Sequence, residues 1–323
     1  VKKGDLFVCT KGVTADRHDF VDDAVKNGAS AIVASRKVDV TVPVIMVEDT
    51  NKELPLLCSR FYDHPEEKLK MYAVTGTDGK TSVATIVQYL LGSNMGTNGR
   101  SCYKFNKETS NTTVDSDKLY KYLNDFLEAG CKEVMMEASS EAFFRGRLTN
   151  IMYDIGAITN VTREHLNIHG TFENYLNCKC QLFRQIKKDG YAILNKDDEY
   201  YNEIRKSCNC ENVYTYGKGE ENTLQIVNFE IFPNKTKITY KFDNKIYNVE
   251  SPLLGDFNVY NLACGLLVAI ASGRTLDEVI PNIASINVSG RLDILPNIGQ
   301  KFTVMVDYAH TPNGISNLLN FVK

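Results

Sequence analysis

This sequence lacks the features that mark membrane and nucleic-acid-binding proteins. No apolar run among its 323 residues is long enough to span a membrane, and no signal peptide is recognisable. The formal net charge is −3 and no basic cluster stands out, which argues against a nucleic-acid partner. We therefore expect neither membrane insertion nor nucleic-acid binding. Hydrophobic residues make up 43% of the chain, and its length favours two or three domains with real cores.

Cysteines paired at zinc-site spacing are also lacking. The nine cysteines are an odd number and lie scattered through apolar segments, which indicates reduced thiols in a cytosolic protein. Two Cys-x-Cys pairs occur, Cys178/Cys180 and Cys208/Cys210. Structural zinc sites usually have two or more residues between paired cysteines, so we expect no zinc site here.

One stretch carries the strongest chemical signal. Residues 76–81 read Gly-Thr-Asp-Gly-Lys-Thr, after an apolar run, Met71–Val74, that predicts a buried strand. Apolar residues at helical spacing follow over Val83–Leu91. A strand, a glycine loop and a helix that begins with Lys-Thr form a phosphate cradle, in which backbone N–H groups face the anion. Lys80 adds a positive charge and the Thr81 hydroxyl can hold Mg²⁺. A glycine turn that merely caps a helix would not explain Lys80-Thr81.

Residues 1–68 are predicted to form a small α/β domain. Strands and amphipathic helices are expected to alternate over Leu6–Val8, Asp19–Gly28, Ala31–Ala34, Val42–Val47 and Leu54–Tyr62. The sequence His-Pro-Glu-Glu at 64–67 is expected to be the linker to the next domain. Because Val1 already lies inside a pattern, we expect the beginning of this domain to be missing.

Residues 69–291 are predicted to form the larger central domain. Further helices and strands are expected at Leu119–Ala129, Glu133–Ala138, Ile155–Thr159, Phe172–Ile186, Tyr191–Leu194 and Leu262–Ser272. This alternation predicts a mostly parallel sheet with helices on both faces and ligands beyond the carboxyl ends of its strands. The β pattern over 213–250 predicts antiparallel hairpins near the sheet edge, and the long polar stretch 92–116 is typical of a binding loop.

Residues 292–323 are expected to begin a third domain. A strand is predicted from Phe302 to Val306 and a helix from Ile315 to Val322, where the sequence stops. One strand and one helix cannot form a domain, so we expect a C-terminal domain of Rossmann-like type to be truncated here.

Several motifs in this order make the chain resemble the Mur ligases, the ATP-dependent enzymes that build the peptide of bacterial cell-wall precursors. The motifs are Thr75–Thr81, Asn111-Thr112-Thr113, Glu137–Ser140, Thr159-Asn160, His165–Gly170, Tyr175–Phe183, Gly255–Asn261, Ser289–Arg291 and Asp307–Pro312. Each motif alone is modest, but together they cover nearly the whole chain. The resemblance is strongest to the ligases that add the third amino acid to UDP-N-acetylmuramoyl-L-alanyl-D-glutamate.

The resemblance implies a role for each matched residue. The catalytic group would be Lys80, Glu137, His165 and a carbamylated Lys179, and the ligands of two Mg²⁺ ions would be Thr81, Glu137, His165 and Lys179. The ATP-binding residues would be Gly76, Thr77, Asp78, Gly79, Lys80, Thr81, Ser82, Asn160, Asn258, Asn261, Arg291 and Asp307. The UDP-muramoyl-peptide contacts would be Asn111, Thr112, Thr113, Ser139 and Arg147. Carbamylation would turn a lysine that repels a metal into an anionic oxygen ligand.

Simpler interpretations of these residues stand beside those roles. Glu137 could merely adjoin a helix N-terminus, and Lys179 could be a solvated helix lysine. Asn258 and Asn261 could cap a helix that begins near Leu262. His165 and His169 are four residues apart, as in a zinc pair on one helix face, but no glutamate lies between them in the metalloprotease arrangement.

The sequence also departs from the pattern of the family. Asp78 stands where asparagine is usual, Asp293 where glutamate is usual, and Glu141 and Arg145 replace the residues usual after the Ser-Ser pair. Asp78 places a negative charge near the phosphates.

The resemblance implies an amide-forming ligase in peptidoglycan synthesis. ATP would phosphorylate the side-chain carboxylate of D-glutamate, and the amine of L-lysine or meso-diaminopimelate would attack the acyl phosphate. The expected enzyme is a monomer in the bacterial cytoplasm, with the UDP-muramoyl dipeptide and an amino acid as its substrates. Two alternatives stay open: a related ligase (of the next Mur step, or of the folylpolyglutamate or cyanophycin type), and a catalytically impaired nucleotide-binding partner of another protein.

Overall fold

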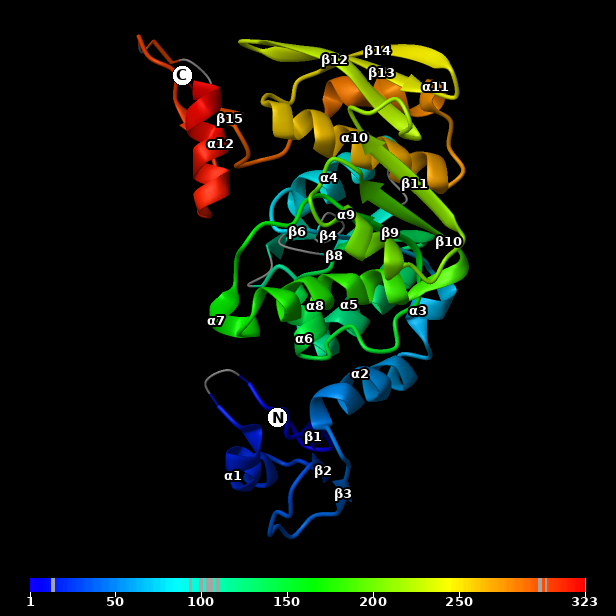
Figure 1. The fold of residues 1–323 in the computed structure, drawn as a ribbon. Coiled ribbons are helices and arrows are strands. Elements are labelled where there is room, and N and C mark those ends of the chain that lie inside the picture. Colours follow the sequence, from blue (N-terminus) through cyan, green and yellow to red (C-terminus); the bar gives the residue numbers. More distant parts are fainter. Residues whose placement is uncertain are drawn as a thin grey trace.

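The computed structural model describes residues 1–12, 15–92, 95–98, 101–102, 107–108, 111–295, 298–299 and 301–322. Figure 1 shows a small N-terminal unit, a large central unit built on one sheet, and a C-terminal segment that ends in a helix beside the central unit. The α/β class predicted from the sequence is therefore confirmed. The bounds 1–68, 69–291 and 292–323 stay a prediction.

The N-terminal unit contains a three-stranded parallel sheet. Its strands are β1 (Leu6–Val8), β2 (Ala31–Ala34) and β3 (Val44–Met46), in that order. All three were predicted. The helix expected at Asp19–Gly28 is a 3₁₀ turn, η1 (Arg17–Phe20), followed by α1 (Val21–Lys26). Val21 and Ala24 of this helix pack with Ile32 in a small core.

The link between the first two units is more ordered than expected. Helix α2 (Thr50–Phe61) begins four residues before the predicted start, because the Asp49 side chain accepts hydrogen bonds from the N–H groups of Asn51 and Lys52. Residues 64–67 were expected to be a linker, but most of them lie in a short helix, α3 (Pro65–Lys68). Proline occupies the first position of this helix, where its missing N–H has no intrahelical partner to lose.

The central unit is organised around a nine-stranded sheet with the order β14-β13-β12-β11-β10-β9-β4-β8-β5. Neighbours from β12 to β5 are parallel, and β12, β13 and β14 form an antiparallel meander at one edge, as the β pattern over 213–250 predicted. The strands are β4 (Lys70–Thr75), β5 (Met95–Asn98), β8 (Glu133–Glu137), β9 (Tyr153–Ile158), β10 (Ile186–Asn195), β11 (Asn212–Gly217), β12 (Leu224–Phe232), β13 (Lys235–Phe242) and β14 (Lys245–Ser251).

Helices cover both faces of this sheet, as predicted (Figure 1). Helices α4 (Lys80–Leu91) and α10 (Asp256–Ala271) cover one face, and α5 (Ser116–Glu128), α6 (Ser140–Phe144) and α8 (Phe172–Arg184) cover the other. Successive side chains of a strand point to opposite faces. Accordingly, Tyr72 and Val74 of β4 pack in the first core, and Met71 and Ala73 pack in the second.

Short elements complete the described part of this unit. They are β6 (Ser101–Cys102), β7 (Lys107–Glu108), α7 (Leu166–His169), α9 (Tyr201–Lys206), α11 (Leu276–Val279) and η2 (Ile280–Ser285). Much of the polar stretch 92–116, expected to be a binding loop, lies outside the described residues.

The C-terminal segment contains a two-stranded antiparallel sheet, β15 (Asp293–Ile294) with β16 (Met305–Val306), and the helix α12 (Pro312–Val322). Within the described ranges, no single helix is long and apolar enough to cross a membrane. One helix pair bent by 120°, Asp256–Ala271 with Leu276–Ser285, passes that test by length and composition. Eleven residues of α10 are buried, and many of them pack in the first core.

Candidate nucleotide and substrate sites

The glycine loop joins β4 to α4 at the carboxyl edge of the central sheet. Gly76 has φ +145° and Gly79 has φ +85°, conformations that L-residues with a side chain rarely adopt. Both glycines also lie against other elements. A Cβ on Gly76 would overlap the Thr159 side chain, and a Cβ on Gly79 would lie 2.5 Å from Asn261 Oδ1. The two glycines therefore permit both the backbone path and the close approach of β9 and α10.

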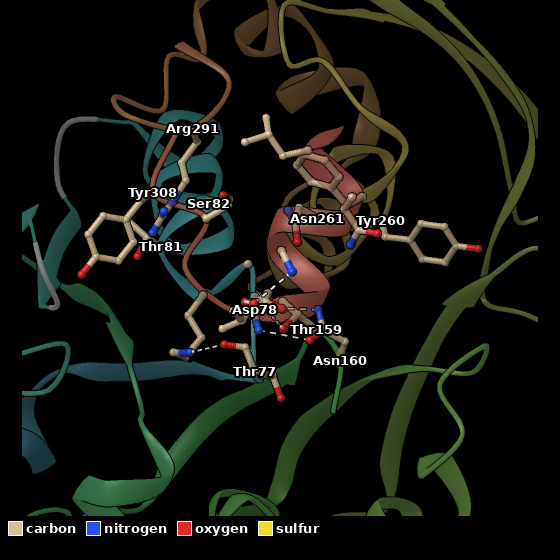
Figure 2. Close-up of a pocket in the computed structure, with 18 of the residues that line it drawn as sticks. Thr77, Asp78, Thr81, Ser82, Thr159, Asn160, Tyr260, Asn261, Arg291 and Tyr308 are labelled. Atoms are coloured by element: carbon tan, nitrogen blue, oxygen red, sulfur yellow. Dashed lines mark hydrogen bonds between the residues drawn. The ribbon is translucent and has the colours of Figure 1, made fainter. Parts of the chain in front are cut away.

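Polar groups that follow β9 fix the loop from one side. Thr159 Oγ1 donates a 2.6 Å hydrogen bond to the carbonyl of Asp78, and Asn160 Nδ2 donates to the same carbonyl. In return, the Asp78 N–H donates to Asn160 Oδ1 and the Thr77 N–H donates to the Asn160 carbonyl. Figure 2 shows Thr159 and Asn160 beside Thr77 and Asp78. The loop is thus held in one conformation by the strand that pairs with β4.

Lys80 and Thr81 begin α4, and their side chains contact the glycine loop and Glu137. Lys80 Nζ donates hydrogen bonds of 2.9 Å to the carbonyls of Gly76 and Thr77. Thr81 Oγ1 donates a 3.0 Å hydrogen bond to Glu137 Oε2. Glu137 ends β8, the parallel neighbour of β4, and is only 2% exposed. A hydroxyl and a buried carboxylate therefore meet beside the loop, an oxygen donor set of the kind that Mg²⁺ prefers.

A cavity of about 480 Å³ opens over this loop. Predicted residues that line it are Thr77, Asp78, Gly79, Lys80, Thr81, Ser82, Thr112, Glu137, Asn160, His165, Asn261, Arg291 and Asp307. Other lining residues were not among the predicted site residues: Asn195, Asp197, Asp198, Tyr260, Tyr308, His310 and Thr311. Asn195 ends β10, and Asp197 and Asp198 follow it. Their position at the carboxyl end of a parallel strand could have identified them from the sequence.

The two asparagines of α10 do not cap a helix that begins near Leu262, because α10 begins at Asp256 and includes both. Asn258 is 3% exposed and its Nδ2 donates to the Leu254 carbonyl. Asn261 is 5% exposed and its Nδ2 donates to Asn258 Oδ1. Asn261 therefore lines the cavity and packs on Gly79. Asn258 does not line the cavity, but it accepts the hydrogen bond that orients Asn261.

Lys179 does not line this cavity, and it is not a solvated helix lysine. It is 1% exposed in α8, and its Nζ lies 4.5 Å from the centroid of the Tyr175 ring. Burial, and next the charge of Lys80, lower the pKa of the Lys179 amine well below its usual range. A lysine in this environment favours the neutral amine, which is the form that can react with CO₂.

His165 and His169 lie at the two ends of α7 (Leu166–His169) and have different surroundings. His165 adopts a left-handed conformation (φ +56°) at the N-terminus of α7, and it lines the cavity. Burial lowers the pKa of both imidazoles. His169 is 3% exposed and its Nε2 shares a 3.1 Å hydrogen bond with Ser140 Oγ. In the ranges that the structure describes, the one group of three His, Cys, Asp or Glu side chains close enough to share a metal ion is His64, Glu66 and Glu67, far along the chain from these residues.

The C-terminal segment closes one side of the cavity. Asp307 accepts hydrogen bonds from the N–H groups of Leu292 and Ala309, and the Arg291 guanidinium lies 4.6 Å from the centroid of the Tyr308 ring. Thr311 Oγ1 donates a 3.3 Å hydrogen bond to Asp78 Oδ1. The departure at Asp78 thus places a carboxylate against the beginning of α12.

The residues predicted to contact the peptide substrate gather around Thr113. This side chain is 1% exposed. Its Oγ1 donates to the Glu137 carbonyl, accepts from the Ser139 N–H and lies 3.1 Å from Ser139 Oγ. Arg147 Nη1 donates to the Thr113 carbonyl, and Arg147 Nε lies 2.9 Å from Asp115 Oδ1. Thr113 and Ser139 therefore connect this region to the strand that carries Glu137.

Arg147 also lines a second cavity, between the N-terminal and central units. This cavity measures about 530 Å³, and its other charged lining residues are Lys11, Arg17, Lys118, Arg145, Asp115 and Asp117. Arg145 is paired with Glu141 at 2.7 Å, so the two unusual residues after the Ser-Ser pair form an ion pair with each other. Asn111 is exposed and does not line this cavity.

Comparison with known proteins identifies relatives over the whole chain. A family model described as the Mur ligase middle domain matches residues 74–269, and one described as the catalytic domain of the Mur ligase family matches residues 1–65. The chain is 37% identical over 336 residues to the UDP-N-acetylmuramoyl-L-alanyl-D-glutamate–2,6-diaminopimelate ligase of Bacillus cereus. It is 36% identical over 339 residues to the enzyme of that name from Geobacillus thermodenitrificans. Each alignment covers 100% of this chain and 68% of the relative.

Solved structures agree with this result. A structure of a UDP-N-acetylmuramoyl-L-alanyl-D-glutamate–2,6-diaminopimelate ligase superposes with a TM-score of 0.82 at 26% identity, covering 100% of this chain and 68% of the other. MurF from Thermotoga maritima, solved with ADP, gives 0.74 at 24% identity over 99% of this chain and 72% of its own. A folylpolyglutamate synthase of Mycobacterium tuberculosis gives 0.70 at 16% identity over 84% and 70%. The last two likenesses concern the fold alone.

Proposed function

Because the chain belongs to the Mur ligase family, we propose that it joins 2,6-diaminopimelate to UDP-N-acetylmuramoyl-L-alanyl-D-glutamate at the expense of ATP. The relatives at 36–37% identity carry this activity in their names, and the sequence motifs had already favoured the third-residue step. Between the two amino acids that the motifs left open, the names of these relatives favour diaminopimelate over L-lysine.

One observation supports the site assignment above the others. The Thr81 hydroxyl in the first turn of α4 and the buried Glu137 carboxylate at the end of β8 lie 3.0 Å apart, and both residues line the cavity over the glycine loop. A helix-capping turn alone would not bring a buried carboxylate from another strand to this hydroxyl. The arrangement suits a nucleoside triphosphate, with the loop N–H groups and Lys80 facing the phosphates.

The residues present suit the proposed magnesium ions. Thr81 and Glu137 would hold one ion, and His165 with a carbamylated Lys179 would hold the second. Mg²⁺ there would neutralise phosphate charge. Lys179 supports the carbamylation because its amine is buried and its pKa is lowered, so the neutral form is available to bond with CO₂ and release one proton.

The chemistry proposed for the chain depends on positioning rather than on a covalent nucleophile. The second cavity would hold the UDP-muramoyl dipeptide, with Arg147 and neighbouring cations facing its anionic groups. The γ-phosphoryl group of ATP would pass to the side-chain carboxylate of D-glutamate. The amine of diaminopimelate would then attack this acyl phosphate, forming the amide and releasing phosphate. Asn261 and Arg291 would contact the nucleotide directly, whereas Asn258 and Asp307 would act through the backbone and side chains that they hold.

The test is a direct assay of the complete protein with ATP, Mg²⁺ and the UDP-muramoyl dipeptide. Meso-diaminopimelate, L-lysine and L-ornithine would be supplied separately and the product identified by mass. We expect a tripeptide product with diaminopimelate, and no product from the Lys80→Met variant. No product with any amino acid, in a preparation that binds ATP, would contradict the proposal and favour the impaired-partner alternative. Cytoplasmic location and a monomeric state stay predictions.

A further inference from the structure

Tyr175 is completely buried in α8, between Lys179 and the glycine loop of residues 76–79, which we call the phosphate loop because of its proposed role. A 2.8 Å hydrogen bond joins its hydroxyl to Thr77 Oγ1. Thr77 Oγ1 also accepts a 2.9 Å hydrogen bond from the Thr162 N–H, in the segment that follows β9. The side chain of Thr77 is therefore held at two points, one on the helix that carries Lys179 and one on the segment that leads to His165.

The ring of Tyr175 faces the proposed second metal site. Lys179 follows Tyr175 by one helical turn, and its Nζ lies 4.5 Å from the ring centroid. The rings of His169 and His165 have their centroids 5.3 and 6.1 Å from that of Tyr175. One aromatic side chain thus touches the loop through its hydroxyl and covers the Lys179 amine with its face.

A buried core tyrosine would be the simpler explanation, and the same core provides the comparison. Tyr153 is also 0% exposed and packs in the same core, but its hydroxyl has no hydrogen-bond partner among the described residues. The hydroxyl of Tyr175 is different, because it forms a hydrogen bond that reaches the phosphate loop.

We propose that Tyr175 is a positioning residue that fixes the phosphate loop through Thr77 and covers the Lys179 amine with its ring. The hydroxyl sets the orientation of Thr77 and of the neighbouring loop N–H groups that would face the phosphates. The ring keeps water from the amine and fixes its direction. The part of the inference that concerns Lys179 depends on the proposed function, whereas the part that concerns the loop requires only that the loop binds ATP.

The experiment compares Tyr175→Phe with Tyr153→Phe in the complete protein. Binding of a non-hydrolysable ATP analogue would be measured by isothermal titration calorimetry, and KM and kcat in the ligase assay. We expect Tyr175→Phe to weaken analogue binding and raise KM for ATP about fivefold, the effect of one neutral hydrogen bond. Its kcat, and its KM for the UDP-muramoyl dipeptide, should stay within twofold of wild type. Tyr153→Phe should change none of these values by more than twofold.

Two further variants separate the hydroxyl from the ring. Thr77→Val removes the same hydrogen bond from the loop side, so its affinity for the analogue should fall at least as far as that of Tyr175→Phe. Tyr175→Leu removes the ring as well, and its kcat should fall at least tenfold below that of Tyr175→Phe.

The loop part of the proposal would be overturned if Tyr175→Phe and Thr77→Val bound the analogue with the same affinity as Tyr153→Phe. An unchanged kcat in Tyr175→Leu would overturn the ring part. If the wild-type protein binds the analogue but forms no tripeptide, the proposed function fails while the loop part is still decided by the binding data.

Discussion

Replacing Gly76 by alanine tests whether the phosphate loop is locked by its contact with β9. Gly76 has φ +145°, and an added Cβ would overlap Thr159 Oγ1 and lie 3.2 Å from the Thr159 Cβ. The hydroxyl that would have to move is the one that donates a 2.6 Å hydrogen bond to the Asp78 carbonyl. The substitution should therefore disturb the loop through Thr159 and not only through its own backbone.

The expected free energies of unfolding follow from these contacts. Gly130→Ala is the control for backbone strain, because Gly130 has φ +78° and nothing lies within 4 Å of an added Cβ; it should cost about 1 kcal/mol. Thr159→Ala removes the buried hydrogen bond and a methyl group, about 2 kcal/mol. Gly76→Ala adds overpacking and the displaced hydrogen bond to the strain, about 4 kcal/mol.

The double variant, Gly76→Ala with Thr159→Ala, decides the matter. Since the second substitution removes the atom that the new Cβ would overlap, the double variant should cost about 3 kcal/mol, against about 6 kcal/mol for independent effects. Urea unfolding would give these free energies, and isothermal titration calorimetry would give the affinity of each variant for an ATP analogue. Additive losses, or a loss from Gly76→Ala no larger than that from Gly130→Ala, would refute the locked-loop reasoning.

Three further predictions concern charge and burial. Asp78→Asn removes a negative charge beside the proposed phosphate site and should tighten ATP binding about fivefold (roughly 1 kcal/mol) by calorimetry; unchanged or weaker binding would contradict it. Arg274→Met breaks a bidentate pair with the largely buried Glu133, at 2.6 and 2.8 Å, and should lower the free energy of unfolding by about 2 kcal/mol, against less than about 0.5 kcal/mol for the exposed Lys121→Met. Burial raises the pKa of the Cys264 thiol to about 12, so the unfolded state loses this proton first and stability falls as pH rises above about 9. Between pH 8 and 10, the free energy of unfolding of Cys264→Ala should therefore fall by about 1 kcal/mol less than that of wild type. Parallel profiles of unfolding free energy against pH for the two proteins would be evidence against this cause.

The phosphate loop could be predicted from the sequence because its determinants are local. Residues 71–91 contain the strand, both glycines, the Lys-Thr pair and the helix, and the structure has the strand at Lys70–Thr75 and the helix at Lys80–Leu91. Glu137 could be found for a related reason, since it ends an apolar strand and the carboxyl ends of parallel strands share one edge of the sheet.

The start of α10 could not be predicted in the same way. The sequence from Asp256 to Asn261 is mixed in polarity, and Gly255 offers no side-chain cap, so the apolar pattern alone placed the helix near Leu262. The side chains of Asn258 and Asn261 are instead buried, and they form hydrogen bonds to the Leu254 carbonyl and to each other. Only the packing of α10 on the glycine loop shows why polar residues occupy buried positions there.

The helical conformation of the predicted linker, residues 64–67, could not be predicted for a different reason. His64 adopts a left-handed conformation (φ +55°), and Pro65 then begins a helical turn instead of an extended segment. Glu66 becomes 3% exposed and accepts a hydrogen bond from Ser59 of α2. A proline after a polar residue indicates a turn, but the burial that makes this turn helical comes from the neighbouring helices.

The direction of the Asp78 side chain could not be predicted from the sequence. From the sequence, its charge near the phosphates predicted either weaker nucleotide binding or an offset by Mg²⁺. Together with the altered residues after the Ser-Ser pair, it was the best support for the impaired-partner alternative. The structure places Oδ1 of this carboxylate 3.3 Å from Thr311 Oγ1, and Thr311 Oγ1 accepts a hydrogen bond from the Gly314 N–H in the first turn of α12. The positive end of that helix therefore faces the carboxylate. Asp78 thus connects the phosphate loop to the segment that closes the cavity. We therefore expect its charge to weaken nucleotide binding about fivefold and not to abolish it.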